Sequence, residues 1–204
     1  MPEISAAPAQ RAAQTRHLRL AAALIALAWM VPAGALSPLS DFKTDSYLGS
    51  WYEIAAIRGF LQSKCARDTR TDYSTDSDGA FALNSTCMRV DGSAEHSESR
   101  ARPLDPTLPS VLKITSVHLL GIWWYPFGRE SIVIARGPDS KWIVLGHPSL
   151  RYARILSREP AFSDDSLKAA ANALNDSHFD LCALTLTPQT GGRDKGGRLC
   201  DAIQ

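Results

Sequence analysis

The chain has 204 residues, and its 22 basic and 21 acidic side chains give a formal net charge of +1. This length suits one domain with short additions, and it is enough to bury a hydrophobic core. The balanced charge, without a cluster of Lys and Arg in the body of the chain, argues against a nucleic-acid partner.

Residues 1–35 have the three parts of a secretory signal peptide. The basic part contains Arg11, Arg16 and Arg19; an apolar part at 20–31 and small residues at 33–35, a cleavage site, follow it. A membrane-spanning helix needs about 20 apolar residues, so this segment is too short for an anchor. No Cys follows the cleavage site, so we expect no lipid anchor either. The mature protein is therefore expected to be periplasmic or secreted.

The folded part opens with Tyr47-Leu48-Gly49-Ser50-Trp51-Tyr52-Glu53-Ile54-Ala55. Gly49 permits a tight turn, and Trp51 begins a run of residues that favour strands. Short β-favouring segments then alternate with turn residues at hairpin spacing. We expect eight strands, at 51–57, 66–73, 80–89, 95–102, 111–118, 131–135, 142–147 and 151–157. Because no helix is expected between them, the pattern favours an all-β, eight-stranded antiparallel up-and-down β-barrel.

One α-helix and a ninth strand are expected after the barrel strands. Ser163 is a suitable N-cap, and Leu167, Ala170, Ala171 and Leu174 form one apolar face. The ninth strand is expected at 181–187. Residues 188–204 are polar and Gly-rich, which predicts a loose tail apart from Cys200. The expected organisation is a signal peptide at 1–35, a barrel domain at 36–189 and a C-terminal tail at 190–204.

This order of elements is similar to that of the lipocalins. Gly49-x-Trp51 followed by Tyr-Glu-Ile-Ala resembles the first strand of the bacterial lipocalin and apolipoprotein D-like branch. Leu156-Ser157-Arg158-Glu159-Pro160 resembles the motif that ends the eighth strand in that family. The resemblance covers about 47–189 and implies a structural floor in which Gly49, Trp51 and Arg158 close one end of the barrel. One departure is the turn at 136–139, where the family has Thr-Asp-Tyr, so any receptor contact associated with that turn is in doubt.

The resemblance implies a cavity that binds one small hydrophobic or amphipathic ligand, of the fatty acid or lysophospholipid type. Transport or storage, in envelope lipid maintenance, is the implied role, without catalysis, metal or cofactor. Small residues expected to point inward are Ala55, Ser99, Ala101, Ser116, Ser131 and Ala135; the alternative is that they pack against larger neighbours. The candidate ligand-binding residues are Glu53, Ala55, Ile114, Ser116, Trp123, Trp124, Tyr125, Ser131, Val133 and Arg154.

Two charged residues are expected inside the barrel. Glu53 has the strand parity of Trp51, and Arg154 has that of Arg158. Burying either charge alone is costly. They can pair with each other, or Arg154 can meet a ligand carboxylate or phosphate. The alternative is that both lie at a wet barrel mouth or pair with other neighbours.

The aromatic segment 119–128 follows the expected fifth strand, so we place it at the open end together with Phe60 and Leu61. Trp123, Trp124 and Tyr125 would form a rim that grips the ligand, meets a membrane surface or joins two subunits. The alternative is that the two indoles fold back over barrel residues. A monomer or weak dimer is expected.

All four cysteines lie in the exported part, which indicates disulfides in an oxidising compartment. A turn centred near 76–77 places Cys65 across from Cys87, which leaves Cys182 with Cys200. The rival is Cys65 with Cys200, which resembles the bridge of apolipoprotein D. A catalytic alternative, isomerase- or epoxidase-like, would need Cys65 as a free nucleophile. A third alternative is a protein–protein interaction module that uses the mouth loops.

Overall fold

The structure is a computed structural model that describes residues 36–59, 64–76 and 78–204. Residues 36–204 form one compact unit. The predicted signal peptide at 1–35 and the Phe60-Leu61 tip lie outside the described residues. Within the described part of the chain, no helix is long and apolar enough to cross a membrane.

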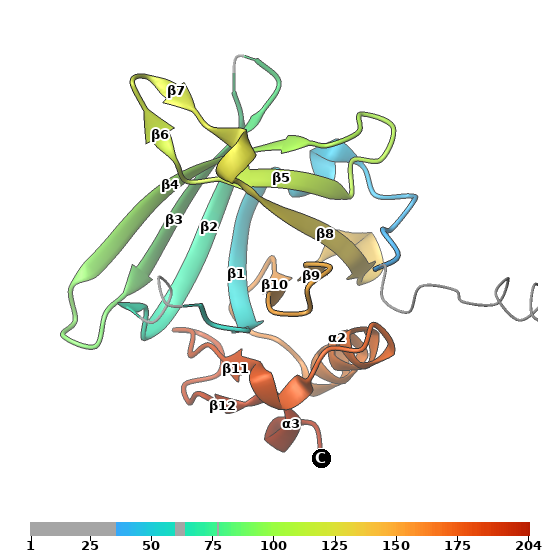
Figure 1. Cartoon of the computed structure of the whole chain (residues 1–204). Coiled ribbons are helices and arrows are strands. Elements are labelled where there is room, and N and C mark those ends of the chain that lie inside the picture. Colours follow the sequence, from blue (N-terminus) through green and yellow to red (C-terminus); the bar gives the residue numbers. More distant parts are fainter. Residues whose placement is uncertain (1–35, 60–63, 77) are drawn as a thin grey trace, which may run out of the picture. The chain divides into compact units, whose positions relative to one another are not determined.

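Eight antiparallel strands form the predicted closed barrel (Figure 1). They are β1 (Gly49–Ala56), β2 (Arg67–Thr75), β3 (Phe81–Met88), β4 (Ala94–Pro103), β5 (Val111–Thr115), β8 (Arg129–Arg136), β9 (Trp142–Gly146) and β10 (Ala153–Ser157). Each pairs with the next, and β10 pairs with β1, for example Ser157 with Tyr52, which closes the sheet. The eight-stranded barrel expected from the sequence is therefore confirmed.

Alternation along the strands produces two hydrophobic clusters. The inner cluster contains Trp51, Leu112, Val133, Ile143 and Leu156 among others. The residues next to them in sequence, such as Ile132, Val144 and Ile155, point the other way and pack with helix α2 (Asp164–Asp176). The helix begins as expected, because the Ser163 side chain accepts a hydrogen bond from the Ser166 N–H. Its apolar face, Leu167, Ala170, Ala171 and Leu174, is buried against the outer wall of the barrel.

Two β-bulges reverse the side-chain parity that the sequence predicted. The register of β1 shifts between Glu53 and Ala55, and that of β8 shifts between Val133 and Ala135. Each bulge inserts one residue, so the following side chains change face. Ala55 is consequently part of the outer cluster, and Ala135 packs against the same cluster. The expectation that these two alanines line the barrel interior is wrong.

The expected fifth strand is shorter than predicted. It ends at Thr115 instead of 118, and a separate two-stranded hairpin follows, formed by β6 (His118–Leu119) and β7 (Ile122–Trp123). A 3-10 helix, η4 (Tyr125–Phe127), then leads into β8. The strand stops because the Thr115 hydroxyl donates to the Trp124 carbonyl at 2.8 Å, which folds the chain back on itself.

The C-terminal tail is ordered, contrary to expectation. The expected ninth strand is a 3-10 helix, η6 (Leu181–Ala183), followed by β11 (Thr185–Leu186), which pairs with β1. Beyond it, β12 (Gly197–Arg198) pairs with β11, and α3 (Leu199–Ala202) buries Leu199 completely. The side-chain amide of Gln189 donates to the carbonyls of Glu53 and Thr69, which fixes the tail to the barrel wall.

Both predicted disulfides are confirmed. Cys65 pairs with Cys87 across a Cα–Cα distance of 5.6 Å, and Cys182 pairs with Cys200. The register behind the first prediction differs, however. Arg70 lies opposite Thr86, so the turn is centred on residue 78 and not near 76–77. A bulge between Arg67 and Arg70 and the Ala66 N–H bond to the Met88 carbonyl bring the two cysteines together nevertheless.

Candidate functional site

One end of the barrel is closed by Trp51. The indole is fully buried, and its Nε1 donates to the Tyr47 carbonyl at 2.7 Å. The Arg158 guanidinium lies 3.6 Å from the ring centroid and donates to the carbonyls of Ser46 and Ser50. Gly49 has φ of +93°, a backbone conformation that strains any residue with a Cβ, so glycine is favoured at this position. The role that the family resemblance implies for these residues matches this geometry.

Aromatic rings fill the barrel next to this floor. The Tyr47 ring lies 6.0 Å from that of Tyr73 and 5.4 Å from that of Phe81. Phe42 joins them, with its ring 4.8 Å from that of Tyr47, because the segment before β1 runs under the floor through the 3-10 helix η2 (Thr44–Tyr47). The interior near Trp51 is therefore a packed core, and any ligand must lie farther along the strands.

Charged residues begin two positions beyond the floor. Glu53 is buried, and its Oε1 accepts a hydrogen bond from the Thr187 hydroxyl at 2.8 Å. Its other oxygen, Oε2, lies 3.3 Å from Arg154 Nε on the neighbouring strand β10. Of the arrangements that the sequence left open, the structure contains the pair between Glu53 and Arg154. The bond from Thr187, in the ordered C-terminal segment, had no signal in the sequence.

A second guanidinium lies near this pair. Arg129, the first residue of β8, is exposed, and its guanidinium carbon is 4.2 Å from the centroid of the Tyr152 ring. Arg154 lies on the same ring at 5.6 Å. Two guanidinium groups therefore lie over the ring of Tyr152, and one of them, that of Arg154, also pairs with Glu53. Sequence reasoning missed Arg129 and Tyr152, although Arg129 has the parity of the predicted residues Ser131 and Val133.

Burial affects the titration of this region. Although burial acts to lower it, the pKa of the Arg154 guanidinium lies above its ordinary value because Tyr152, Glu53 and Tyr73 are close. Arg154 is thus a cation at any physiological pH. Burial also raises the pKa of the Tyr73 phenol, which stays neutral.

The other predicted ligand-binding residues fall into two groups. Ile114, Ser131 and Val133 belong to or contact the inner face, with Ser131 opposite Leu112 in the register. Ser116 is exposed beyond the end of β5 and shares a 2.7 Å hydrogen bond with Ser99.

Trp123 and Tyr125 lie elsewhere. They rest on the guanidinium groups of Arg100 and Arg102, which have the opposite parity to the buried interior residue Ala101. These two rings therefore cover the outer face of β4. Arg100 also pairs with Asp76, so the aromatic segment lies beside the β2–β3 turn. These contacts do not support the expected position of the segment at the rim of the barrel mouth.

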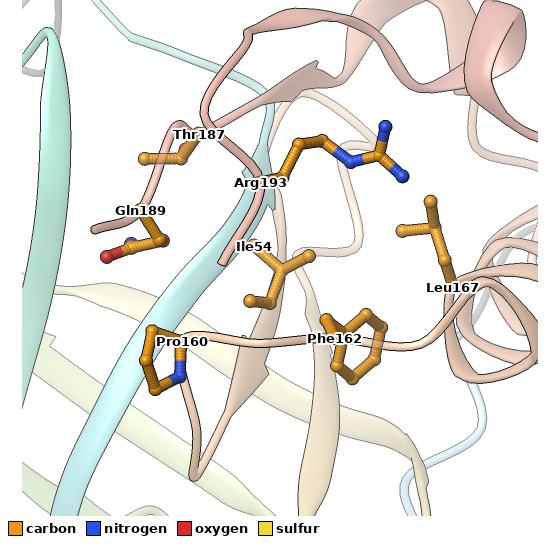
Figure 2. A pocket seen from close by; sticks show the side chains of 7 residues that line it. All are labelled: Ile54, Pro160, Phe162, Leu167, Thr187, Gln189 and Arg193. Carbon is orange, nitrogen blue, oxygen red and sulfur yellow. The ribbon is translucent and has the colours of Figure 1, made fainter. Parts of the chain in front are cut away.

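A small pocket lies outside the barrel, between β1, α2 and the C-terminal segment (Figure 2). It is lined by Ile54, Pro160, Phe162, Leu167, Thr187, Gln189 and Arg193. Its volume of about 10 Å³ has room for about one water molecule. It is too small for a ligand and belongs to the packing of the helix against the barrel.

The described residues offer no cluster of three or more His, Cys, Asp or Glu side chains that could hold a metal ion. Cys65, the candidate nucleophile of the catalytic alternative, is bonded to Cys87 and has no free thiol.

These features define a single up-and-down β-barrel with a floor Trp–Arg pair, a helix on its wall and a charged group inside. Residues 42–189 match the family model of the Lipocalin-like domain, and the chain belongs to the lipocalin family. It is 30% identical over 154 residues to temperature-induced lipocalin-1 of Arabidopsis thaliana, covering 74% of this chain and 82% of that protein. It is 24% identical over 168 residues to outer membrane lipoprotein Blc of Escherichia coli K12, covering 82% and 91%. Insecticyanin of the tobacco hornworm, Manduca sexta, superposes with a TM-score of 0.59 at 18% identity, covering 78% and 90%.

Proposed function

We propose that this lipocalin binds one amphipathic small molecule in the barrel, with the ligand's anionic end near Arg129 and Arg154. The observation that carries the proposal is the spatial order of side chains along the barrel interior, from the floor toward the other end. A packed aromatic and aliphatic floor is followed by two guanidinium groups over the ring of Tyr152, those of Arg129 and Arg154, and Arg154 also pairs with Glu53. A fatty acid or a lysophospholipid combines an acyl chain with the negative charge that suits this arrangement.

The role would be transport or storage of this ligand outside the cytoplasm. Two disulfides favour an oxidising compartment, such as the periplasm or the extracellular space. The name of the E. coli relative, an outer membrane lipoprotein, supports a place in the cell envelope. Binding without catalysis is the function we propose, because the one nucleophile that the sequence suggested is consumed in a disulfide.

The experiment compares a fluorescent fatty acid with the matching fatty alcohol in wild type and in Arg129→Gln. Arg129 is chosen over Arg154 because its loss leaves no buried carboxylate unpaired. Loss of a charge-assisted hydrogen bond of about 1.5 kcal/mol should weaken acid binding roughly tenfold and leave alcohol binding unchanged.

The matched control is Arg136→Gln at the other end of the same strand, where the arginine pairs with the exposed Asp41. It should leave both affinities unchanged. An equal loss of acid and alcohol binding in Arg129→Gln would contradict the anionic site, and no saturable binding of either probe would contradict the proposed function.

A further inference from the structure

The β6–β7 hairpin exposes apolar side chains to solvent. Leu120 at its tip is 97% exposed, and Leu119, Ile122 and the adjoining Phe127 are 56%, 62% and 70% exposed. The hairpin forms a two-stranded sheet of its own, apart from the strand pairing of the barrel (Figure 1). These four exposed apolar side chains lie within nine residues of the chain, and such a concentration indicates an interaction site, whereas single scattered ones do not.

The backbone at the tip strengthens this observation. Leu120 has φ of +53° and Gly121 has φ of +78°, so both central residues of the two-residue turn are left-handed. Such type I′ turns favour Asn-Gly, Asp-Gly or Gly-Gly, because these residues adopt positive φ readily. Leucine is disfavoured at this position because a residue with a Cβ is strained at positive φ. An exposed leucine has the second disadvantage that its apolar side chain remains in water. A partner that removes Leu120 from water would offset the second cost.

The base of the hairpin is fixed. The Trp124 N–H donates to the Val117 carbonyl at 2.9 Å, next to the bond from Thr115 to the Trp124 carbonyl. Gly128, just before β8, lies so close to β5 that a Cβ on it would sit 2.7 Å from the Ile114 carbonyl oxygen. The apolar tip is therefore presented by a braced arm, which reduces the entropy that binding must overcome.

The side chains change character along this arm. Behind the aliphatic tip, the Trp123 ring stacks on His118 at 4.5 Å. Behind the rings, Arg100 lies 4.9 Å from the centroid of Trp123, and the exposed Arg102 lies 4.2 Å from that of Tyr125. The order is aliphatic, then aromatic, then charged: Arg100 pairs with Asp76, and the exposed Arg102 adds a cation beside it.

We propose that the β6–β7 hairpin docks this protein on a lipid bilayer that contains anionic lipids. A bilayer has the same order from its interior outward: hydrocarbon, an interface that favours Trp and Tyr, and negatively charged phosphates that attract Arg. His118 lies opposite Trp123 in the hairpin, so the level of Trp123 is two residues behind Leu120, or about 7 Å at about 3.4 Å per residue. Apolar faces of interfacial segments enter to about 5–10 Å, so the tip can reach the acyl boundary while the arginines stay at the phosphates.

A second copy of the chain fits these observations less well. A stable protein interface buries about 800 Å² on each partner, which requires a broad surface. A two-residue turn presents a narrow tip instead. The docking proposal does not depend on ligand binding in the barrel, because the hairpin covers the outer face of β4.

The test uses residues 36–204, which form a compact unit without the apolar stretch 20–31 that would bind lipid by itself. Co-sedimentation is measured with vesicles of phosphatidylethanolamine and phosphatidylglycerol. Wild type should bind, with a blue shift of its Trp fluorescence. Leu120→Asn creates Asn-Gly, so it should keep or improve folding while it lowers the partition coefficient about tenfold or more, the effect of removing one buried leucine.

The matched control is Val90→Asn. Val90 is 90% exposed in the turn between β3 and β4, at the opposite end of β4 from Arg100. It should leave vesicle binding unchanged, whereas Arg102→Gln should weaken binding only to vesicles that contain phosphatidylglycerol. Wild type that stays in the supernatant, or equal binding by Leu120→Asn, would overturn the proposal. So would a lipid-free dimer that Leu120→Asn dissociates, because the hairpin would then bind a second copy.

Discussion

In the pair formed by Glu53 and Arg154, the buried carboxylate determines how much unfolding free energy is lost when the arginine is replaced. Glu53 is 4% exposed and already bonded to Thr187, so its carboxylate cannot turn toward water if Arg154 is lost. In the interior, each charge is tolerated because the other is present.

We predict that Arg154→Met destabilises the protein more than the double variant Glu53→Gln, Arg154→Met. The single change leaves a buried carboxylate without its cation, which costs about 3–5 kcal/mol of unfolding free energy. The double change leaves a neutral amide that still accepts the Thr187 bond. Urea unfolding of both variants measures the difference.

The control for this prediction is Arg136→Met, which breaks the exposed pair with Asp41 and should cost at most about 1 kcal/mol. If the single and double variants unfolded at the same urea concentration, the loss of Arg154 would cost no more with the Glu53 carboxylate present than with a neutral amide in its place. The prediction of an unpaired buried charge would then be wrong.

At the scale of elements, the sequence predicted regular strands well and their interruptions poorly. Trp51, the turn residues and the capped helix at Ser163 have local signals, because strand alternation and N-capping act over a few residues. The bulge before Ala55 has no such signal, since it depends on how β1 meets β10 and β11. The misplaced Ala55 follows from this bulge, and the misplaced Ala135 follows from the bulge between β8 and β9.

The hairpin and the tail illustrate the same limit. Leu120-Gly121 lacks the Asn-Gly signature of its turn, so the segment read as a loop. The tail is polar and Gly-rich, yet Leu199 is fully buried and Cys200 is bonded to Cys182. These tertiary contacts override local composition, and the Thr187 bond to Glu53 at the candidate site was hidden for the same reason.

The two disulfides give an element-scale prediction, because they close loops of similar size. Their sequence separations are 22 and 18 residues. In the chain-entropy model each should stabilise by about 3 kcal/mol. Replacing Cys65 and Cys87 together by Ser, or Cys182 and Cys200 together by Ser, should therefore lower the unfolding free energy by similar amounts in urea.

Hydrogen exchange distinguishes where each loss acts. Without the bond between Cys182 and Cys200, amides of β12 and α3 should exchange faster while β3 remains protected. A tail that stays fully protected in that variant would show that Leu199 and Gln189 hold it without the disulfide.

At the scale of the whole molecule, the closed floor links stability to alkaline pH. Burial raises the pKa of both Tyr47 and Tyr73 well above the ordinary tyrosine value, and the nearby Tyr73 ring adds to the effect on Tyr47. In the unfolded chain both phenols ionise near pH 10. Above that pH the unfolded state has lost protons that the native state still holds, so the contribution of these residues is complete below pH 10 and declines as pH rises.

We predict that the unfolding free energy falls by about 1.4 kcal/mol per pH unit for each of these two tyrosines above about pH 10. Urea midpoints across the alkaline range measure the slope, and phenolate absorbance should show both rings ionising only as the barrel opens. Tyr73→Phe keeps the ring in the floor and removes the titrating group, so its slope should be shallower by one tyrosine. Tyr47→Phe should lower the slope equally but also lower stability at neutral pH, because the Tyr47 hydroxyl donates to the Pro109 carbonyl at 2.9 Å. An alkaline slope that neither variant changes would mean that both phenols ionise as readily in the folded protein as in the unfolded chain, and that other groups control the alkaline limit of the barrel.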